Sequence, residues 1–567
     1  MSTSFIKVKG TQFVVDDSGT EREIVLRGAG LGGWMMMENF ISGFPAVEYQ
    51  MREGLAASIG QEKADFFFEK FLEYFFTKSD AAFYKSLGLN CIRIAINYKH
   101  FEDDMNPRAL KPDAFRHLDR VVSLCADEGI YTIIDLHAAP GGQSGGWHAD
   151  GGTHIGNFWR HKDFQDRFIW LWEEIAKRYK NNTWVAGYNL LNEPADPHPT
   201  QAKLMEIYDR TCKAVSSIDP NHVIFLDGNT FATDFSKFPD DATARWGANI
   251  AFAIHDYATY GFPKFENRAG HGVYTGSDEQ KEKMANVYKT KREWMDKRGF
   301  CVWNGEWGPV YAREDYDGGK EKADEINRRR YMVLRDQLEI YQKDRLSWSI
   351  WLYKDIGFQG MVYVSPNTPY MQHFRSFLHK KYRIAADAWG ADDKLVKHIY
   401  DPIVNLIKTE VPDSDTNRLY PHLWSTEERT SRISRTILLA EYLVAEWADM
   451  FKELVSDDDW KEKLDGLARS FEFENCEKRD ELNGYLQRSA GYVAVQDFGQ
   501  DDEYEDEEVC YVTVELENVE PTLIASSEYM RLIGLDTPTP FMQLSGTILK
   551  GQHDTLIGSE LLFMESK

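Results

Sequence analysis

The chain has 567 residues, enough for a large hydrophobic core and more than one domain. Apolar residues make up 43% of the sequence and aromatic residues 14%, a composition that is typical of globular proteins and excludes a disordered chain. The formal net charge of -25 argues against nucleic acid or an anionic membrane as a partner and favours a neutral substrate.

The first residues and the cysteines bear on the cell compartment. The N-terminal segment MSTSFIKVKGTQFVVDD has no long apolar run behind a basic end, so we expect no signal peptide. No window approaches the roughly 20 apolar residues that a membrane span needs. The six cysteines are scattered without a CxxC pair, as in a reduced intracellular protein. These features predict a cytoplasmic protein without a membrane span.

Short apolar segments alternate with amphipathic helical segments from about residue 20 to residue 380. Such alternation implies parallel strands joined by crossover helices, and eight units predict an α/β fold, a closed (β/α)8 TIM barrel over residues 1–384. An open doubly wound sheet is the alternative, but no glycine-rich phosphate loop follows the first strand. The eight predicted strands are EIVLRGAGL, CIRIAIN, YTIIDLH, VAGYNLLNE, HVIFLDGN, NIAFAIHDY, FCVWNGEW and LSWSIWLYK.

The rest of the chain has a different pattern. Residues 385–498 show helical spacing of apolar residues, as in DDKLVKHIYDPIVNLIKTEV and SRISRTILLAEYLVAEWADMFKELV, and predict a helical appendage on the barrel. The acidic run DDEYEDEEV follows, and it predicts a solvated linker at residues 499–508. Residues 509–567 alternate apolar and polar side chains between glycines and prolines, which predicts a small separate β module.

In a barrel of this kind the chemistry takes place at the C-terminal ends of the strands. A lone histidine at a strand end is more often structural than functional, and a lone glutamate there often caps a helix. Polar or aromatic residues at most of the strand ends together indicate one site. The strand ends carry Arg93, Asn97, His137, Asn192, Glu193, His255, Tyr257, Glu306 and Trp351.

Glu193 and Glu306, at the ends of strands four and seven, are the pair that a retaining glycosidase requires. One carboxyl group must be neutral to protonate the leaving oxygen, and the other must be ionised to attack the sugar. Arg93 and Tyr257 are candidate hydrogen-bond donors to Glu306, and Asn192 is a candidate partner of the sugar 2-hydroxyl. Trp351 offers a flat apolar face to a sugar ring. This chemistry needs no cofactor or metal, and no HExxH-type spacing is present.

The motifs IRIAIN, DLH, NEP, HDY, GEWG and SIWLYK together resemble glycoside hydrolase family 5, over roughly residues 5–400. The segments RGAGLGGWMMMENFI and DLHAAPGGQSGGWHADGG resemble its fungal exo-β-1,3-glucanase branch. The resemblance implies that Glu193 is the acid/base, that Glu306 is the nucleophile, and that Glu38 helps to bind the terminal glucose. His137 and His255 match family motifs at the substrate site.

The resemblance therefore implies a retaining, exo-acting β-glycosidase that hydrolyses a β-glucosidic bond of an oligosaccharide or glucoconjugate. Trp147 and His148 add bulk to the rim, and the helical appendage is additional to the branch, so the substrate stays open. A diglycoside-releasing, rutinosidase-like enzyme and a steryl or lipid glucosidase are the alternatives. Residues 509–567 resemble the small β-barrel subunit of the transcription factor that recruits RNA polymerase III. This likeness implies a protein partner. The alternative class of function is therefore an assembly or transcription-factor partner that acts through residues 509–567.

Overall fold

The computed structural model describes most of the chain, which divides into two compact units, Met1–Tyr492 and Val493–Lys567. The described residues are 4–17, 19–152, 155–266, 271–386, 393, 395–411 and 424–491, together with the strands of the second unit. The predicted linker, residues 499–508, lies outside them. The predicted domain boundaries stay predictions.

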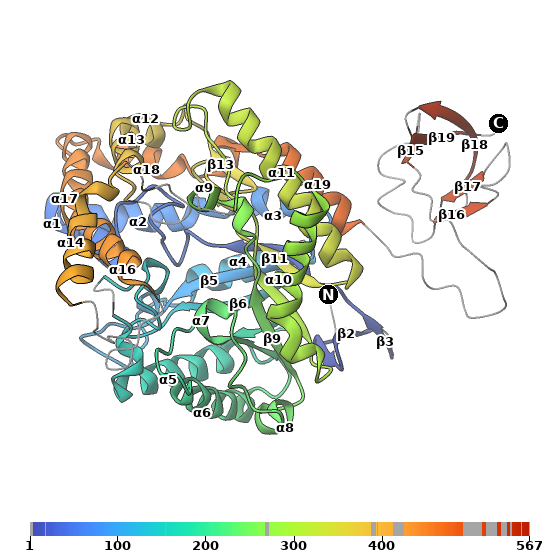
Figure 1. Cartoon of the computed structure of the whole chain (residues 1–567), viewed down its shortest axis with the longest axis horizontal. Coiled ribbons are helices and arrows are strands. Elements are labelled where there is room, and N and C mark those ends of the chain that lie inside the picture. The colour runs from blue at the N-terminus through green and yellow to red at the C-terminus, as the bar shows by residue number, and fades with distance from the viewer. Residues whose placement is uncertain are drawn as a thin grey trace. The chain divides into compact units, whose positions relative to one another are not determined.

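The first unit is built on a closed barrel of eight parallel strands, as predicted, and each predicted strand contributes one of them (Figure 1). The barrel closes through pairing of Trp348 with Arg27 and of Gly28 with Cys91 on either side of the first strand. The strands are β4 (Arg27–Leu31), β5 (Cys91–Asn97), β6 (Tyr131–Ala138), β7 (Val185–Asn189), β8 (Val223–Asp227), β9 (Ile250–His255), β10 (Val302–Glu306) and β11 (Ser347–Ile350).

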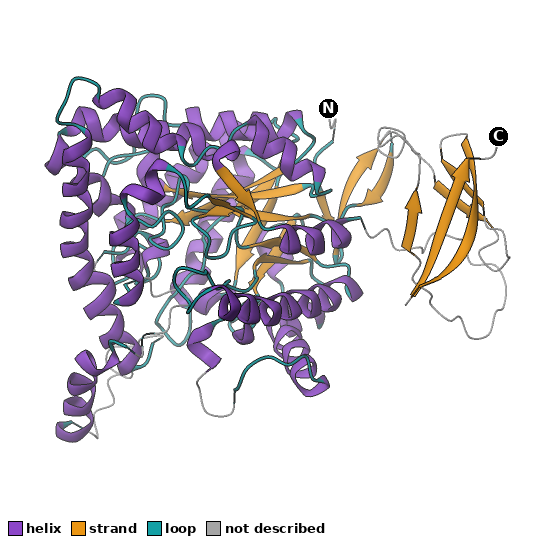
Figure 2. Cartoon of the chain, turned by 90° about the horizontal axis from the view of Figure 1, so that it is seen from above, coloured by secondary structure: helices purple, strands orange, loops and turns teal. Residues whose placement is uncertain are grey.

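Helices surround the barrel strands of the first unit, as Figure 2 shows. Helix α4 illustrates the reason, because its Leu118, Val121, Val122 and Cys125 recur at helical spacing and are buried against the barrel. The helices up to the end of the barrel are α1 (Glu48–Ile59), α2 (Gln61–Phe75), α3 (Lys78–Ser86), α4 (Arg116–Asp127), α5 (Lys162–Tyr179), α6 (Ala202–Ile218), α7 (Asn229–Ala232), α8 (Ala242–Trp246), α9 (Pro263–Glu266), α10 (Asp278–Asp296), α11 (Lys320–Lys343), α12 (Pro369–His373) and α13 (Arg375–Arg383).

The N-terminal end of the barrel is closed by a three-stranded antiparallel sheet that the sequence did not predict. It consists of β1 (Lys7–Lys9), β2 (Gln12–Asp17) and β3 (Thr20–Glu23). Phe13 and Val15 of this sheet join one buried cluster with Phe225 and Trp303 of the barrel strands. Since this end is filled by apolar side chains, only the opposite end is open to carry polar chemistry.

The segment after the barrel is largely helical, and it packs on the barrel unit: α17 lies against α1, and α18 against α2. Its helices are α14 (Lys397–Glu410), α16 (Thr426–Arg432), α17 (Leu439–Met450), α18 (Trp460–Arg469) and α19 (Asp480–Ala490), with a π-helical turn at Ile433–Leu438. One strand interrupts it. The polar strand β14 (Cys476–Lys478) pairs with β13 (Val362–Val364), and β13 pairs with β12 (Lys354–Asp355).

The second unit contains a five-stranded sheet in the order β15-β19-β18-β17-β16. Only β15 and β19 are parallel neighbours, and the other pairs are antiparallel. These strands fall in the segments that the alternation predicted. They are β15 (Thr513–Leu516), β16 (Met530–Ile533), β17 (Phe541–Leu544), β18 (Thr547–Leu556) and β19 (Gly558–Glu565).

Two further features of the described residues concern the predicted compartment. The cysteines described, Cys91, Cys125, Cys212, Cys301 and Cys476, are free thiols, and Cys510 lies outside the described residues. Among the helices described, none combines the length and the apolar character that crossing a bilayer requires.

Candidate active site

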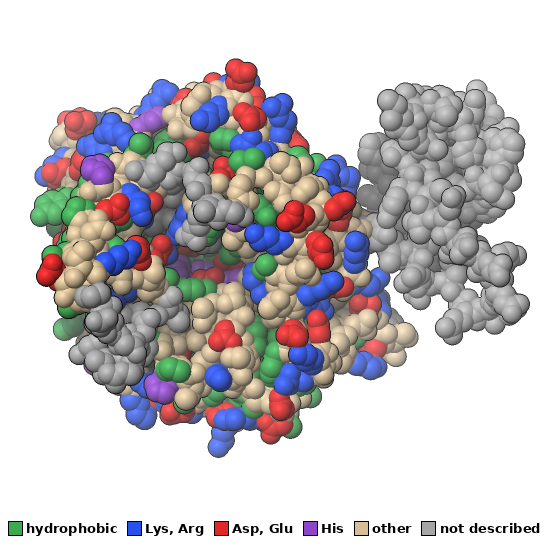
Figure 3. Space-filling model, viewed as in Figure 1, with side chains coloured by type: hydrophobic (Ala, Val, Ile, Leu, Met, Phe, Trp, Pro, Cys, Tyr) green, Lys and Arg blue, Asp and Glu red, His purple; other side chains and the backbone are tan. Residues whose placement is uncertain are grey.

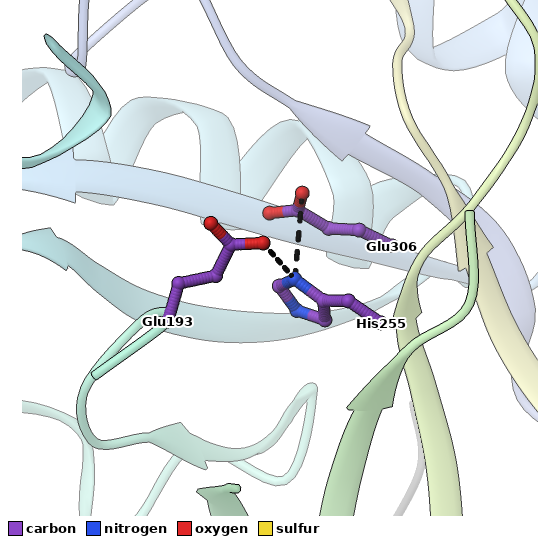
Figure 4. A group of neighbouring side chains, drawn as sticks. All are labelled: Glu193, His255 and Glu306. Carbon is purple, nitrogen blue, oxygen red and sulfur yellow. Dashed lines mark hydrogen bonds and ion pairs between the residues drawn. The ribbon is translucent and has the colours of Figure 1, made fainter. Parts of the chain in front are cut away.

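Two glutamates face each other across His255 at the C-terminal end of the barrel (Figure 4). Glu193 follows β7, and its Oε1 lies 2.7 Å from His255 Nδ1. Glu306 ends β10, and its Oε2 lies 3.6 Å from the same nitrogen. One ligand atom from each of the three residues falls within 4.8 Å of the others, so the group is also spaced to hold a metal ion. The two carboxyl groups are therefore close neighbours.

Glu306 receives hydrogen bonds at both carboxylate oxygens. Arg93 Nη1 donates to Oε1 at 2.6 Å, and Tyr257 Oη donates to Oε2 at 2.8 Å. Arg93 is fully buried, and it also forms an ion pair with Asp135 at 3.1 Å. Two donors, one of them charged, stabilise the ionised form of a carboxylate. The prediction that Arg93 and Tyr257 donate to Glu306 agrees with this geometry.

Arg93 also orients the amide next to Glu193. Its Nη2 donates to Asn192 Oδ1 at 2.7 Å, and its Nε donates to Asn189 Oδ1 at 3.1 Å. The amide nitrogen of Asn192 lies 3.2 Å from His137 Nε2. Because its oxygen accepts from an arginine, the Asn192 side chain has only one orientation that satisfies both neighbours.

His137 and Glu38 form the opposite side of the site. Asp135 Oδ2 lies 2.7 Å from His137 Nδ1, which fixes the ring, and Glu38 Oε1 lies 3.9 Å from its Nε2. Trp147 Nε1 donates to Glu38 Oε2 at 3.0 Å. Burial raises the pKa of Glu38 to about 8. Glu38 is therefore neutral at pH 7 in the free protein and has one oxygen directed toward His137.

Trp351 lies under this side of the site, stacked on His137 with ring centroids 5.3 Å apart and an interplanar angle of 9°. A Cβ on Gly30 or Gly32 would come within 2.5 Å of the indole ring. Gly30 and Gly32 are therefore required by the approach of Trp351 to the first strand.

Glu193 is held by its backbone as well as its side chain. Its φ is 46°, in the left-handed region, and its N–H donates to Asp227 Oδ2 at 2.9 Å. Left-handed backbone costs a non-glycine residue roughly 1–2 kcal/mol, so this conformation is imposed by its surroundings. His148 Nε2 lies 3.4 Å from Glu193 Oε2, on the side away from His255. Burial lowers the pKa of His148 to about 4, so that imidazole is neutral.

His255 and Glu193 share one proton. Burial raises the pKa of Glu193, but the hydrogen bond and charge of His255 outweigh burial and lower the pKa to about 2. Burial lowers the pKa of His255, and the charges of Glu306 and Glu193 outweigh burial and raise it. Both shifts favour the ion pair, with the proton on the histidine, over the neutral pair.

Comparison with known proteins identifies the family. The family model described as Cellulase (glycosyl hydrolase family 5) matches residues 62–357. A β-xylosidase of Phanerodontia chrysosporium is 58% identical over 492 residues, covering 87% of this chain and 99% of the relative. The chain belongs to glycoside hydrolase family 5. This hydrolase has a β-glycoside as its class of substrate, which confirms the coarse prediction from the sequence.

Other comparisons match parts of the hydrolase chain. A probable glucan 1,3-β-glucosidase A of Neosartorya fischeri is 27% identical over 247 residues, covering 42% of this chain and 56% of that protein. The solved structure of endoglucanase Cel5A from Thermotoga maritima aligns with 50% of this chain and 84% of its own, at 20% identity and a TM-score of 0.40. The family model described as TFIIIC subunit triple barrel domain matches residues 505–567. The resemblances noted in the sequence are confirmed.

Contacts connect all the site residues that the sequence of this hydrolase predicted. The predicted residues are Glu38, Arg93, His137, Asn192, Glu193, His255, Tyr257, Glu306 and Trp351. Asn97, also a strand end, turns away from the site and donates to Glu48 Oε2 at 3.3 Å.

The sequence did not predict the roles of Asp135 and Asp227. Asp135 precedes His137 by two residues, and this strand spacing puts both side chains on one face of β6. That spacing was a usable signal. Asp227 also ends a strand, and the same rule that found the other residues would have included it.

Proposed function

We propose that the protein is a retaining, exo-acting β-glycosidase, with Glu306 as nucleophile and Glu193 as acid/base. One observation carries the proposal: oxygens of the two carboxyl groups lie within 4.8 Å of each other. Retaining enzymes place these groups about 5–5.5 Å apart, whereas inverting enzymes leave roughly 6.5–9.5 Å for a water molecule. The short separation supports direct attack on the sugar by one carboxylate.

In the first step, Glu306 attacks the anomeric carbon while the bond from that carbon to the leaving oxygen breaks. The proton that the leaving oxygen needs comes from Glu193. In the second step, water gives a proton to Glu193 and displaces Glu306 from the sugar, which restores both carboxyl groups. Arg93 and Tyr257 donate hydrogen bonds to both oxygens of Glu306 and hold its carboxylate in position before the attack.

The acid proton reaches Glu193 from His255, 2.7 Å away. A bound sugar excludes water from the pair, and a low dielectric favours the neutral arrangement, in which the carboxyl group carries the proton. Formation of the bond between Glu306 and the sugar removes one negative charge beside His255, which lowers the proton affinity of that histidine. Glu193, which has given its proton to the leaving oxygen, is then ionised and can accept a proton from water. The pair therefore changes roles between the two steps.

The exo mode is supported by the closed side of the site. Glu38 is 5% exposed, and Trp147 covers it from the loop after β6. A buried carboxyl group at that place can bind hydroxyl groups of a terminal sugar, and the indole of Trp147 closes that side of the site among the described residues.

Two sugars are candidates for the glycone. The fungal branch noted in the sequence is named for glucose, and β-glucosides are the first candidate. The relative that is 58% identical is named a β-xylosidase, and this favours β-xylosides as the second candidate. Steryl and lipid glucosides stay open as leaving-group alternatives, and release of a diglycoside from a rutinoside stays open as a glycone alternative.

Purified protein is tested first on 4-nitrophenyl β-glucoside and β-xyloside, then on laminari-oligosaccharides, steryl glucoside, glucosylceramide and a rutinoside. The cleaved substrate is followed by NMR in the first minutes, before the anomers equilibrate. We expect the β-anomer first. An initial α-anomer would contradict the retaining mechanism, and hydrolysis of none of these substrates would contradict the proposed function.

The tail has a second candidate role. Residues 505–567 match the TFIIIC subunit triple barrel domain, and we propose that this module binds a protein partner. A module of this size buries little surface alone, and a partner would supply the remainder. A partner protein should co-purify in stoichiometric amount with the full chain. It should not co-purify with a chain that ends at residue 492.

A further inference from the structure

Helix α16 carries side chains onto the rim of the active site, although it lies outside residues 62–357 that match the family model. Figure 3 shows the face of the barrel unit hollowed, with histidine and acidic side chains toward its base. Trp424, just before α16, and Arg432, at its end, contact two loops that follow barrel strands.

Four side chains form a continuous cation–aromatic chain, here called the rim wall. The guanidinium carbon of Arg432 lies 4.1 Å from the ring centroid of Trp424 and 4.9 Å from that of Trp147. Trp424 stacks on Phe231 with centroids 5.8 Å apart at an interplanar angle of 14°. Trp147 belongs to the loop after β6, and Phe231 to the loop after β8. The rim wall therefore connects two barrel loops through one arginine from α16.

A salt bridge to a third loop holds Arg432 in this place. Glu428, one turn earlier on α16, accepts from Arg432 Nε at 3.2 Å and from Lys264 Nζ at 2.8 Å. Lys264 belongs to α9, which follows strand β9. The Arg432 side chain is only 13% exposed. Partly buried cation–π contacts are favourable, so the wall is an ordered part of the rim.

The backbone at Phe231 is strained, and in this conformation the Phe231 ring stacks on Trp424. Thr230, Phe231 and Ala232 have φ values of 54°, 59° and 57°. Left-handed backbone is unfavourable for each such residue, and strain of this kind concentrates at functional sites. The Phe231 N–H lies 3.4 Å from the carbonyl oxygen of Pro194, the residue that follows Glu193.

The Phe231 end of the wall stands on the proton-donor side of the site, whereas Trp147 covers Glu38. His148 links the two, because its Nε2 lies 3.4 Å from Glu193 Oε2 and its ring centroid lies 6.0 Å from that of Phe231. The acid/base residue approaches the leaving oxygen, so side chains beyond its carboxyl group, away from Glu306, border the leaving group. The contacts thus place Phe231, Trp424 and Arg432 beside the leaving group.

We infer that the rim wall limits the leaving group to one ring, so that the protein prefers aryl glycosides and disaccharides to longer chains. The inference rests on the proposed function and adds the specificity-determining residues Trp424 and Arg432. A longer leaving group must cross between the loops after β6 and β8, where Arg432 joins Trp147 to Trp424. Neither residue touches the reacting atoms, so both act on binding and not on bond cleavage.

The test compares Trp424→Ala and Arg432→Ala with the wild type on 4-nitrophenyl β-glucoside, laminaribiose and laminaripentaose. If an oligosaccharide is not cleaved, its inhibition constant is measured in the hydrolysis of the nitrophenyl substrate. That constant is then compared in place of kcat/KM. We expect the ratio of pentasaccharide to disaccharide efficiency to rise at least fivefold in both variants, through KM. On the nitrophenyl substrate any change should be in KM, because neither residue touches the reacting atoms.

Arg429→Ala is the matched control, because it removes an arginine from the same helix, one turn before Arg432. It should leave the length ratio unchanged. Arg432→Lys keeps the charge without the planar group and should behave as Arg432→Ala. The inference is wrong if the length ratio is unchanged in Trp424→Ala and Arg432→Ala, or if it changes equally in Arg429→Ala. Wild type that cleaves no β-glycoside would instead contradict the proposed function, so the two failures are distinguishable.

Discussion

The two catalytic glutamates differ in their neighbours, and this difference predicts different responses to substitution. Glu306→Ala removes the attacking group, so activity should be lost on every glycoside. Glu193→Ala removes only proton donation, which contributes about 10²–10⁴-fold and matters least when the leaving group is good. We therefore expect Glu193→Ala to lower kcat/KM strongly on an alkyl glycoside and weakly on a 2,4-dinitrophenyl glycoside.

Azide provides the control for this assignment. It should partly restore Glu306→Ala by taking the place of the carboxylate, and it should form the α-glycosyl azide, because only one displacement occurs. With Glu193→Ala, azide should give the β-glycosyl azide by attack on the covalent intermediate. If both variants responded alike to leaving-group quality, the two roles would be assigned wrongly.

Glu38 predicts a pH dependence of stability. Burial raises its pKa from 4.5 to about 8, so between these values the folded protein keeps a proton that the unfolded chain releases. The stabilising effect of that proton is complete below pH 4.5 and is lost as the pH rises to about 8. Glu38→Gln cannot ionise. As the pH rises across this window, the free energy of unfolding of the variant should therefore increase relative to that of the wild type by up to about 1.4 kcal/mol per pH unit.

Denaturant unfolding at pH 5, 6.5 and 8 measures this difference. Glu48 offers a control of opposite sign, since burial raises its pKa but the charges of His100 and Arg52 outweigh burial and lower it. Glu48→Gln should lose stability relative to the wild type at neutral pH. A constant difference between Glu38→Gln and the wild type would show that Glu38 is ionised throughout.

The site residues were predictable to the extent that they end barrel strands. Parallel strands bring their C-terminal ends to one edge, so Arg93, His137, Glu193, His255 and Glu306 could be grouped without knowledge of the loops. The contact of His148 with Glu193 was not predictable, because it depends on the path of a loop from Ala139 onward. The rim wall was equally hidden, because Trp424 is 193 residues from Phe231 in the sequence.

At the scale of secondary structure, the sequence predicted elements that carry a regular apolar pattern. The barrel strands are short apolar runs between helical segments, and each was found. Strand β14 was missed because its sequence CEK is polar and too short to show alternation. The left-handed turn at Asn229–Ala232 was missed because its residues have no glycine to signal a positive φ.

Lys354 joins three elements and predicts how strongly the C-terminal helices support the barrel. Its side chain is fully buried, forms an ion pair with Asp80 at 2.6 Å, and donates to the carbonyl oxygens of Phe75 and Phe471 at 2.8 and 2.9 Å. Phe471 lies just after α18. Removing one partner of a buried ion pair typically costs about 3–5 kcal/mol, because the other charge stays buried. Lys354→Met should destabilise the protein by this amount.

Denaturant unfolding tests this, with Lys380→Met as the matched control. Lys380 pairs with Glu446 at 2.5 Å, and their side chains are 41% and 42% exposed. An exposed pair of this kind contributes about 0–1 kcal/mol. Adding Asp80→Asn to Lys354→Met should recover part of the loss by removing the unpaired charge. Equal destabilisation by Lys354→Met and Lys380→Met would show that the buried contact does not support the barrel.

At the scale of the whole molecule, the enzyme chemistry and the tail belong to different units. All the site residues and the rim wall lie in Met1–Tyr492. The alignment with the β-xylosidase relative covers 99% of that protein but only 87% of this chain. The remaining 13% of this chain has no counterpart in the alignment. A protein can therefore carry the matched part without the remainder, and the first unit contains every residue that the proposed mechanism uses.

This division predicts the effect of removing the tail. In the run DDEYEDEE seven of eight residues are acidic, and mutual repulsion makes such a run accessible to protease. We expect limited proteolysis to cut near residues 499–508 and to leave a fragment of residues 1 to about 495 with unchanged kcat/KM on nitrophenyl glycosides. A recombinant chain that ends at residue 492 is the control for damage by the protease. If both shortened chains lost activity, the second unit would belong to the catalytic domain, because no residue of the proposed mechanism would have been removed.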